Sequence, residues 1–496
     1  MPLYLGIDMG TSSIKASLMD GEGTVLLRLE RQSSMLHPGP GLCEVDAEGV
    51  WWKSVCSICQ DVCSRYPASS VRALCVSSVC GSFVPVDAKF RPVHNAVLYG
   101  IDRRSEALLG PLNERYGEDF LRERLGGLFS THAILPKILW FKREMPEVYA
   151  AASHFVSSFN FIGARLTGVA SWDYPTAYGA LMLDGETEGV PAWFLEDQGL
   201  DPGKIPPAGC ALEPLGRVTD EAGRETGLAP GTIVMRGACD INAEAMAVGA
   251  VMPGSAVAVF GSTVSLLLNT ETPQAMAGFM AGRSLVPGVW RLGAATASGG
   301  RTVNWSRNVY GRTDAPASGP DLSDGPGEVY FIPYLEGARA PFNNPAARGA
   351  FLGLSAAHGP ADMARAVYEA LGYELALIIA RMERAAPFPD ILDVSGGLIR
   401  TPNLARLVAD STGKILRLHP DVDASCGDAR IAMLADRPLG ELPFPSQNAL
   451  LCQPSPASPA FREHAERFAA YCEWAAAEPG AVSKSGFLRS AKETTP

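Results

Sequence analysis

The stretch LGIDMGTSSIK, at positions 5–15, contains the residue types that could bind a phosphate group. A short apolar segment leads to Asp8 and then to a turn rich in hydrogen-bond donors. The candidate phosphate ligands in this turn are Gly10, Thr11, Ser12, Ser13 and Lys15. Backbone N–H groups and hydroxyls in such a turn can form a concave anion site. Because Asp8 would repel a bare phosphate, we expect a magnesium ion between them, held by the carboxylate and by phosphate oxygens. An ordinary hairpin with solvated hydroxyls is the alternative, and the Walker A pattern is absent.

A second acidic residue, Asp240, ends a predicted strand at 232–240 and precedes a helix of small residues, INAEAMAVGAV. A carboxylate in this position could act as a general base toward a hydroxyl, and small neighbours would let a polyol approach closely. Aspartate is also a favoured helix N-cap, so a capping role is the alternative.

The elements that must position these residues are strands with helices between them. Apolar alternation predicts a hairpin-rich sheet over 3–30, a helix over 47–66 and a buried strand over 71–79. The segment FGSTVSLLL near 260 repeats the arrangement of strand, glycine, hydroxyls and strand. This echo predicts a duplicated α/β fold with a cleft between its halves, unless the repeat of a common Gly-Ser-Thr turn is due to chance. On that view the carboxylates of Asp8 and Asp240 come from opposite halves and converge on one crevice.

The bulk properties exclude several classes of protein. The chain has 496 residues, enough for two to four domains, and its net charge of −11 disfavours a nucleic-acid surface. It has no apolar run of membrane-spanning length, and MPLYLGID does not resemble a signal peptide. Eleven scattered cysteines favour reduced thiols and a cytoplasmic location. Cys56, Cys59 and Cys63 have helical spacing and predict a buried thiol-rich helix face rather than a zinc site.

The order of motifs resembles the FGGY family of sugar kinases. The stretch 5–15 is similar to the family's first phosphate motif, FGSTVSLLL to its second, and ACDINAEAMAVGAV to its catalytic Gly-Asp helix start. The other similar segments are KILWFKREMPEVY (137–149), PYLEGARAPFNNPAARGAFLGL (333–354), AVYE (366–369) and SGGLIRTPNLARLVAD (395–410). The resemblance covers about residues 3 to 437, and within the family it is strongest to xylulokinases.

The resemblance implies an α/β fold of two actin-like, ribonuclease-H-like ATPase domains flanking a deep catalytic cleft. The N-terminal domain would span 1–243 and carry the sugar and the catalytic base, and the C-terminal domain would span 244–440 and carry the nucleotide. Residues 441–496 would form a helical and irregular tail, mobile in its last dozen residues. The implied enzyme is a carbohydrate kinase that uses ATP and Mg²⁺, without a nucleic-acid or membrane partner. Homodimers are common in that family.

The resemblance also implies roles for individual residues. Asp240 would be the general base and a sugar ligand, and Asp8 the metal ligand. Further phosphate ligands would be Gly261, Ser262 and Thr263. Nucleotide ligands would be Gly300, Asn304, Gly396, Gly397 and Thr401. Other sugar ligands would be Ser78, Val79, Cys80 and Asp102, although Asp102 could instead pair with a neighbouring arginine.

The expected substrate is a ketopentose, D-xylulose first, phosphorylated on its terminal hydroxyl to D-xylulose 5-phosphate. The chain departs from the xylulokinase pattern where the sugar should lie. The usual Gln-Met-His-Gly reads SVCG at 78–81, and the usual Trp-Asn-Asp reads YGID at 99–102. Gluconate, ribulose or erythritol therefore remain alternative substrates. An actin-like ATP-binding regulator without sugar turnover is the alternative from another class.

Overall fold

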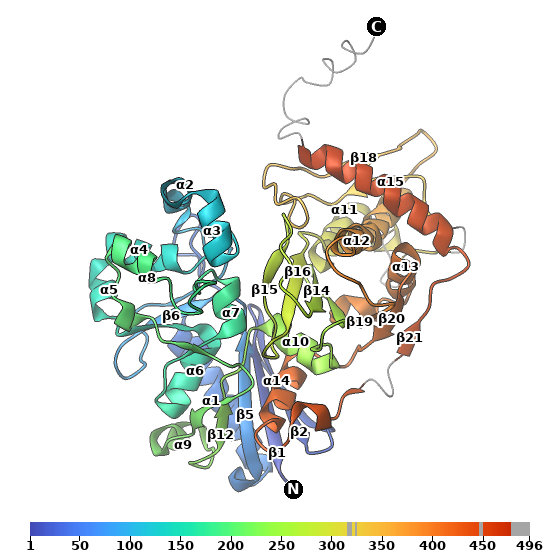
Figure 1. Ribbon diagram of the computed structural model, residues 1–496. Coiled ribbons are helices and arrows are strands. Elements are labelled where there is room, and N and C mark those ends of the chain that lie inside the picture. The colour runs from blue at the N-terminus through green and yellow to red at the C-terminus, as the bar shows by residue number, and fades with distance from the viewer. Residues whose placement is uncertain (315–319, 323–324, 446–449, 478–496) are drawn as a thin grey trace. The chain divides into compact units, whose positions relative to one another are not determined.

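A computed structural model describes residues 1–314, 320–322, 325–445 and 450–477. The chain divides into two compact units (Figure 1). Unit 1 comprises Met1–Val251, Gly282–Val289 and Val422–Phe444, and unit 2 comprises Met252–Ala281, Trp290–Asp421 and Pro445–Pro496. The boundaries expected at 243/244 and 440/441 stay a prediction. The last dozen residues, which we expected to be mobile, lie outside the described residues.

Unit 1 is built on a six-stranded sheet in the order β11-β12-β5-β1-β2-β3. Its strands are β1 (Leu3–Met9), β2 (Ser13–Asp20), β3 (Val25–Gln32), β5 (Val71–Ser78), β11 (Pro214–Arg217) and β12 (Ile233–Met235). Two smaller sheets contain β4 (Glu44–Val45), β6 (Phe83–Val86), β7 (Ala96–Val97) and β8 (His154–Ser157), and β9 (Trp172–Asp173) with β10 (Ala208–Gly209). The predicted hairpin start and the buried strand after it are therefore confirmed.

Helices of unit 1 pack around these sheets. They are η1 (Ala47–Trp52), α1 (Lys53–Arg65), η2 (Ala68–Ser70), α2 (Glu106–Tyr116), α3 (Glu118–Leu125), α4 (Leu135–Glu144), α5 (Pro146–Ala151), α6 (Ser158–Thr167), α7 (Tyr174–Gly179), α8 (Ala192–Gln198), η3 (Pro202–Lys204), α9 (Asp220–Thr226), α10 (Asp240–Val248), α14 (Ala424–Met433) and η5 (Leu439–Glu441). Cys59 is buried on α1, and Cys56 and Cys63 beside it are half-buried. The helix predicted over 47–66 is thus confirmed.

Helix α14 packs directly on β1, and a glycine allows the close approach. A Cβ atom added to Gly6 would lie 2.0 Å from the carbonyl oxygen of Ser425 and 2.3 Å from the amide nitrogen of Ala429. Helix α14 also crosses α10 closely, because a Cβ on Gly427 would lie 1.8 Å from the oxygen of Ala243. Both ends of the predicted site, the end of β1 and the start of α10, are therefore packed against α14.

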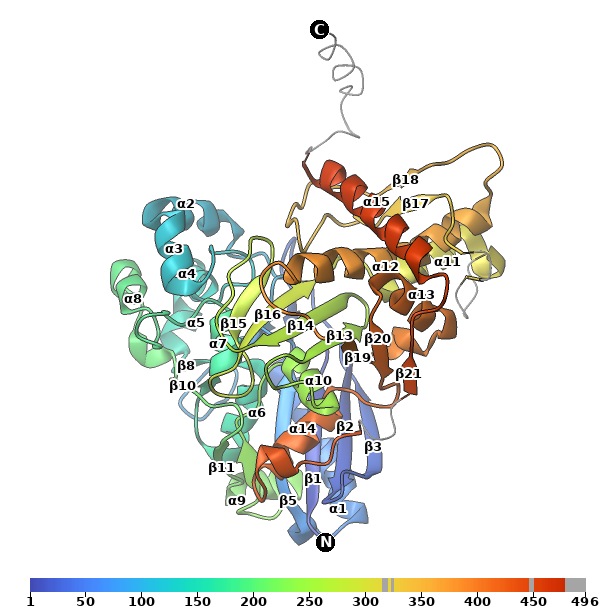
Figure 2. The same cartoon turned by 45° about the vertical axis from the view of Figure 1, so that its right-hand side comes forward.

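Unit 2 contains a seven-stranded sheet in the order β15-β16-β14-β13-β19-β20-β21. Its strands are β13 (Ala256–Phe260), β14 (Val264–Thr270), β15 (Met280–Arg283), β16 (Trp290–Ala295), β19 (Ile391–Ser395), β20 (Ile415–Leu418) and β21 (Leu450–Cys452), and β17 (Tyr330–Ile332) pairs with β18 (Ala350–Leu352). The helices are α11 (Gly300–Asp314), α12 (Pro360–Met382), η4 (Gly397–Arg400), α13 (Pro402–Thr412) and α15 (Ser458–Ala477). The long helix α12 packs against α11, α13 and α15 (Figure 2).

The two sheets repeat one topology. In unit 1, β3, β2 and β1 are antiparallel neighbours, and β5 and β12 continue the sheet in parallel. In unit 2, β16, β14 and β13 are antiparallel neighbours, and β19 and β20 continue in parallel. The echo between the two glycine-hydroxyl turns thus comes from corresponding places in a duplicated α/β fold. Within the described parts of the chain, none of the helices has the length and apolar character needed to cross a membrane.

Candidate active site

A pocket of about 250 Å³ in unit 1 contains most of the residues predicted from the first motif. It is lined by Asp8, Gly10, Thr11, Ser12, Ser13, Lys15, Val79, Tyr99 and Asp240. This lining comes from the end of β1, the turn into β2 and the start of β2, the loop segments after β5 and β7, and the first residue of α10. Both carboxylates belong to unit 1, so the expectation that they come from opposite halves of the molecule is wrong.

The turn between β1 and β2 is closed by a hydrogen bond from the Gly10 amide to the Ser13 carbonyl, 3.0 Å long. The antiparallel register pairs Asp8 with Lys15, which places the ammonium group beside the carboxylate at the mouth of the turn. Lys15 lines the pocket together with the hydroxyls. The turn therefore combines amides, hydroxyls and one cation, the donor set that suits a phosphate.

Asp8 lies among other acidic groups. Burial raises its pKa well above the usual value, and the negative charges of Asp240, Glu244 and Asp423 raise it further, whereas Lys15 lowers it. The Ser77 hydroxyl lies 3.3 Å from the Asp8 carboxylate. Several carboxylates around a phosphate turn make a divalent cation favourable there. In the described residues no group of three or more His, Cys, Asp or Glu side chains is placed to hold a metal ion.

Asp240 is the first residue of α10, and its carboxylate accepts a 2.8 Å hydrogen bond from the amide of Ile241. Burial raises its pKa to about 6, although hydrogen bonds from the backbone of Ile241 and Cys80 lower it. A carboxylate with a pKa near neutrality is suited to accepting a proton from an alcohol. The N-cap position belongs to Cys239, so Asp240 is not the cap residue that the alternative reading proposed.

The residues predicted to bind sugar are arranged in two layers. Val79 lines the pocket, and the backbone of Cys80 donates to Asp240. Ser78 is fully buried behind them, and its hydroxyl contacts that of Ser158.

Asp102 is engaged elsewhere. Its side chain is 0% exposed, and its Oδ1 accepts bonds of 3.1 and 2.8 Å from the backbone and Nε of Arg104. Its Oδ2 accepts from the Cys43 amide at 2.8 Å and from the Arg104 guanidinium at 2.9 Å. Asp102 therefore pairs with Arg104, which is the alternative that the sequence offered, and neither of its carboxylate oxygens faces the pocket.

Tyr99 lines the pocket although it was not among the predicted site residues. Its loop is held from behind by Lys137 of α4, whose ammonium group donates to the carbonyls of Leu98 at 3.0 Å and Tyr99 at 2.8 Å. The next residue, Gly100, allows the ring of His132 to approach, since an added Cβ would lie 2.4 Å from that ring. In the sequence, YGID at 99–102 differs from the expected Trp-Asn-Asp. This difference indicated that the loop belongs to the site, but it did not indicate that the Tyr99 side chain lines the pocket.

The predicted nucleotide residues lie in unit 2, around the turn between β13 and β14. The Gly261 amide donates to the Thr263 carbonyl at 3.0 Å, as Gly10 does to Ser13 in unit 1. The start of α11 contacts this turn through a bond from the Gly300 amide to the Gly261 carbonyl, 2.9 Å long. A Cβ on Gly396, whose φ is 98°, would lie 2.5 Å from the oxygen of Phe260. Three separate chain segments therefore meet at this turn.

The other predicted nucleotide residues lie next to these contacts in the chain. Asn304 is exposed on α11, one turn after Gly300. Gly397 is exposed at the start of η4, and Thr401 occupies the N-cap position of α13 without a side-chain cap hydrogen bond.

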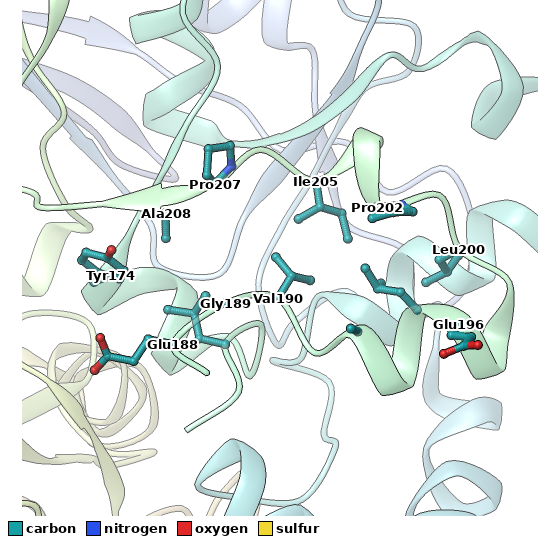
Figure 3. A pocket seen from close by; sticks show the side chains of 13 residues that line it. Tyr174, Glu188, Gly189, Val190, Glu196, Leu200, Pro202, Ile205, Pro207 and Ala208 are labelled. Atoms are coloured by element: carbon teal, nitrogen blue, oxygen red, sulfur yellow. The ribbon is translucent and has the colours of Figure 1, made fainter. Parts of the chain in front are cut away.

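A larger hollow, of about 640 Å³, lies in unit 1 beside α7 and α8 (Figure 3). Its lining is mostly apolar, and its acidic residues Glu188 and Glu196 lie at opposite ends in the view. Glu188 is already paired with Arg283. Among the described residues that line this hollow, none is a cation. It therefore lacks the donor set of a phosphate site, and the smaller pocket is the candidate active site.

The chain belongs to the FGGY family of carbohydrate kinases. The model of the family's N-terminal domain matches residues 3–247, and the model of its C-terminal domain matches residues 256–435. The protein is thus a phosphotransferase of the sugar-kinase class that uses ATP.

Curated relatives within this family carry several names. A xylulose kinase of Escherichia coli is 28% identical over 446 residues, which cover 88% of this chain and 90% of the relative. A glycerol kinase of Rhodospirillum rubrum is 29% identical over 83% of this chain and 86% of its own length. A gluconokinase of Bacillus subtilis is 23% identical over 85% of each chain.

Solved structures confirm the fold. The xylulose kinase from Rhodospirillum rubrum superposes with a TM-score of 0.83 at 24% identity, covering 95% of this chain and 98% of its own. The gluconate kinase from Lactobacillus acidophilus superposes with a TM-score of 0.86 at 20% identity, covering 97% and 99%. The predicted two-domain kinase fold is therefore confirmed.

Proposed function

We propose that this protein transfers the γ-phosphoryl group of ATP to the terminal hydroxyl of a ketopentose, D-xylulose, and forms D-xylulose 5-phosphate. One observation carries the proposal: a carboxylate whose pKa is about 6, Asp240, shares a pocket with Asp8 and a glycine-hydroxyl turn. Xylulose kinases among the curated relatives support the choice of sugar.

In this proposal Asp240 accepts the proton of the sugar hydroxyl while the hydroxyl oxygen forms its bond to the γ-phosphorus and the bond from that phosphorus to the β–γ bridging oxygen breaks. Asp8 would hold Mg²⁺, which neutralises phosphate charge when bound. The turn from Gly10 to Ser13, with Lys15, would orient the transferring group. These positions cost little reorganisation because the strand register and the start of α10 fix them before substrate binds.

The nucleotide would be bound by unit 2. Gly261, Ser262 and Thr263 are proposed to contact ATP phosphates through a turn of the same form as that in unit 1. The remaining proposed nucleotide ligands are Gly300, Asn304, Gly396, Gly397 and Thr401. Glycines at the close contacts would let backbone lie flat beside the adenosine moiety.

For the sugar, we propose that Val79, Tyr99 and Asp240 face the substrate. Ser78, Cys80 and Asp102 would act from behind, since their described contacts are to other protein groups. The pocket volume of about 250 Å³ suits a small polyol rather than an oligosaccharide.

A kinase of another polyol or sugar acid is the second candidate. The glycerol kinase relative is as similar to this chain as the xylulose kinase is, at 29% against 28% identity, and the gluconokinase match covers 85% of this chain against 88% for the xylulose kinase. Two residues that depart from the xylulokinase pattern support this alternative: Tyr99 lines the pocket, and the backbone of Cys80 donates to Asp240.

A coupled assay of ADP release separates the candidates. D-Xylulose, D-ribulose, L-ribulose, erythritol, glycerol and D-gluconate are each offered with ATP and Mg²⁺, and the product is identified by mass spectrometry. We expect the highest kcat/KM with D-xylulose, and turnover lower by roughly 10² to 10⁴ with the Asp240→Asn variant. A tenfold preference for gluconate, glycerol or erythritol would move the assignment to that substrate, and nucleotide binding without turnover of any sugar would overturn the kinase assignment for this chain.

Two further expectations remain predictions. A homodimer is proposed from the family resemblance and can be tested by sedimentation of the purified chain. A cytoplasmic location is proposed from the distribution of cysteines, which are all free of disulfides.

A further inference from the structure

A carboxyl group lies in the interior of unit 2 without a cation beside it. Glu374, in the middle of helix α12, is 2% exposed. Its Oε2 accepts a hydrogen bond from the hydroxyl of Ser298, which is itself 0% exposed. An ionised carboxyl group buried in this way costs free energy. The group that Glu374 can position is its one described hydrogen-bond partner, Ser298.

Ser298 is attached to the proposed phosphate turn by its backbone. Its carbonyl accepts a bond of 3.0 Å from the amide of Val264, the first residue after that turn, and one of 2.7 Å from the hydroxyl of Thr296. The next residue, Gly299, has φ of 151°, and a Cβ there would lie 2.7 Å from the oxygen of Ser262. The segment that begins at Ser298 therefore lies directly against the turn.

The contact continues along the chain. The amide of Gly300 donates to the Gly261 carbonyl at 2.9 Å, and the amide of Arg301 donates to the Ser262 carbonyl at 3.2 Å. Any displacement of Ser298 would be transmitted to both carbonyls, because these bonds span consecutive residues. Glu374 is thus two hydrogen bonds away from the turn that is proposed to hold ATP phosphates.

We propose that Glu374 is a positioning residue for nucleotide binding, which holds Ser298 and, through it, the turn Gly261–Thr263. The inference rests on the proposed role of that turn. It adds a residue from the interior of the unit that does not touch the nucleotide but determines whether its phosphate ligands are in place.

The surroundings of Glu374 favour the neutral form at physiological pH. Burial raises its pKa to about 8, against a lowering effect of the Ser298 hydroxyl. The other titratable groups that its charge influences are the Tyr334 hydroxyl and the Cys472 thiol of α15, and burial raises the pKa of both. No cation is among the groups described as acting on this carboxyl.

Ionisation of Glu374 above pH 8 would place a negative charge behind a turn that binds anionic phosphates. Nucleotide affinity should therefore fall as the pH rises. If bound ADP raises the pKa of Glu374 by about one unit, the dissociation constant for ADP rises about fivefold between pH 7 and pH 9. A glutamine at this position can accept the same hydrogen bond but cannot ionise.

Calorimetric titration of the full chain with Mg-ADP, without sugar, at pH 7, 8 and 9 tests this inference. The wild type should show the fall in affinity, and Glu374→Gln should bind about as tightly at pH 9 as at pH 7. Glu374→Ala and Ser298→Ala should each weaken ADP binding about tenfold at pH 7, the usual effect of losing one buried hydrogen bond. If Glu374→Ala does not fold, Ser298→Ala provides the same measurement with the glutamate in place.

Glu369 provides a matched control on the same helix. It is 1% exposed, but it is paired with Arg365 at 2.7 Å and with the Gly327 amide at 2.9 Å. Glu369→Gln should leave ADP affinity and its pH dependence unchanged. The inference is overturned if Glu374→Gln keeps the wild-type pH dependence, or if Ser298→Ala binds ADP normally.

Thr263→Val separates this inference from the proposed function. If it weakens ADP binding while Ser298→Ala does not, only the role of Glu374 is lost. If Thr263→Val also has no effect, the phosphate role of the turn is lost, and the inference is overturned with it. Because no sugar is present, neither result depends on the identity of the substrate.

Discussion

Burial determines the chemistry of Asp240. In water its carboxyl would be ionised far below neutral pH and would be a weak base, whereas its pKa here is raised to about 6 by burial. Asp8 lines the same pocket, and its pKa is raised well above the usual value by burial and by the charge of Asp240 itself. A cation at Asp8 would favour ionisation of both groups, so metal binding and base strength are linked.

Activity should therefore depend on pH through Asp240. The base must be ionised to accept a proton, so kcat/KM for the sugar should rise about tenfold per pH unit below pH 6 and level off above it. The measurement is kcat/KM at saturating Mg-ATP from pH 4.5 to 7.5, with a coupling system checked at each pH. Activity that stays constant down to pH 5 would contradict the role of Asp240 as base.

The Asp240→Asn variant provides the control. Its activity should be lower by roughly 10² to 10⁴ and should lose the rise through pH 6. Because the folded state raises the pKa of Asp240 from 3.8 to about 6, the free energy of unfolding falls as the pH rises from about 3.8 to about 6 and stays lower above that range. The variant should therefore be at least as stable as the wild type at pH 7, which shows that lost activity is not lost folding.

At the scale of elements, the position of β1 depends on close packing against α14. A Cβ on Gly6 would meet the backbone of Ser425 and Ala429 at 2.0 and 2.3 Å, distances that only movement of the helix can relieve. Gly6→Ala should destabilise the protein by about 1–3 kcal/mol or more and lower kcat, since Asp8 lies two residues further along the strand. Chemical denaturation followed by fluorescence measures the change.

Gly110 provides the matching substitution. It lies on the exposed side of α2, and no heavy atom is within 4 Å of an added Cβ. Apart from the neighbouring Pro111, whose ring disfavours a Cβ on the preceding helical residue, the added methyl meets nothing, so Gly110→Ala should change stability by less than about 1 kcal/mol. If Gly6→Ala were as harmless as Gly110→Ala, the close packing of β1 on α14 would not be needed for the position of β1.

The loop that carries Tyr99 depends on Lys137 of α4. Burial lowers the pKa of this lysine to about 7, and its ammonium group donates to two carbonyls of the loop. Lys137→Met keeps the length of the side chain but leaves the Leu98 and Tyr99 carbonyls without their donor. We expect KM for the sugar to rise about tenfold, as for one or two lost buried hydrogen bonds, with KM for ATP unchanged.

Lys142 is the control on the same helix. Its ammonium group donates to the Gln198 carbonyl at 3.0 Å, away from the Tyr99 loop. Lys142→Met should leave both KM values near those of the wild type. Equal changes in the two variants would indicate a general loss of stability in α4 rather than a specific effect on the sugar loop.

Local patterns in the sequence predicted the elements but not the contacts between them. Alternation and glycines indicated the hairpin around Gly10, and small residues after Asp240 indicated the start of α10. The role of Asp102 depends on Cys43, which is 59 residues away, and on its geometry with Arg104. Tyr99 is placed by Lys137, 38 residues away. Such long-range pairs depend on how elements pack, which no local pattern specifies.

At the scale of the whole molecule, a duplicated fold contains two turns of one form with different tasks. The turn at Gly10 is followed by Lys15 and faces two carboxylates in unit 1. The turn at Gly261 is surrounded by glycine-rich segments and is held by hydrogen bonds through Ser298 in unit 2. The first environment suits a metal and proton transfer, and the second suits a nucleotide. Each unit should therefore bind one substrate, and this division can be measured unit by unit.

Hydrogen exchange followed by mass spectrometry can test this division in the intact chain. A ligand that binds only the folded state stabilises it by about 2.7 kcal/mol when its concentration is a hundred times its dissociation constant. Hydrogen exchange slows in the segments that the bound ligand stabilises. Mg-ADP should protect peptides from β13, β14 and the start of α11, whereas the sugar should protect those from the loops after β5 and β7 and from the start of α10. Thr263→Val should abolish protection by Mg-ADP but not by the sugar. Protection of the β13 and β14 peptides by the sugar alone, as strong as that by Mg-ADP, would show that the two tasks are not divided between the units.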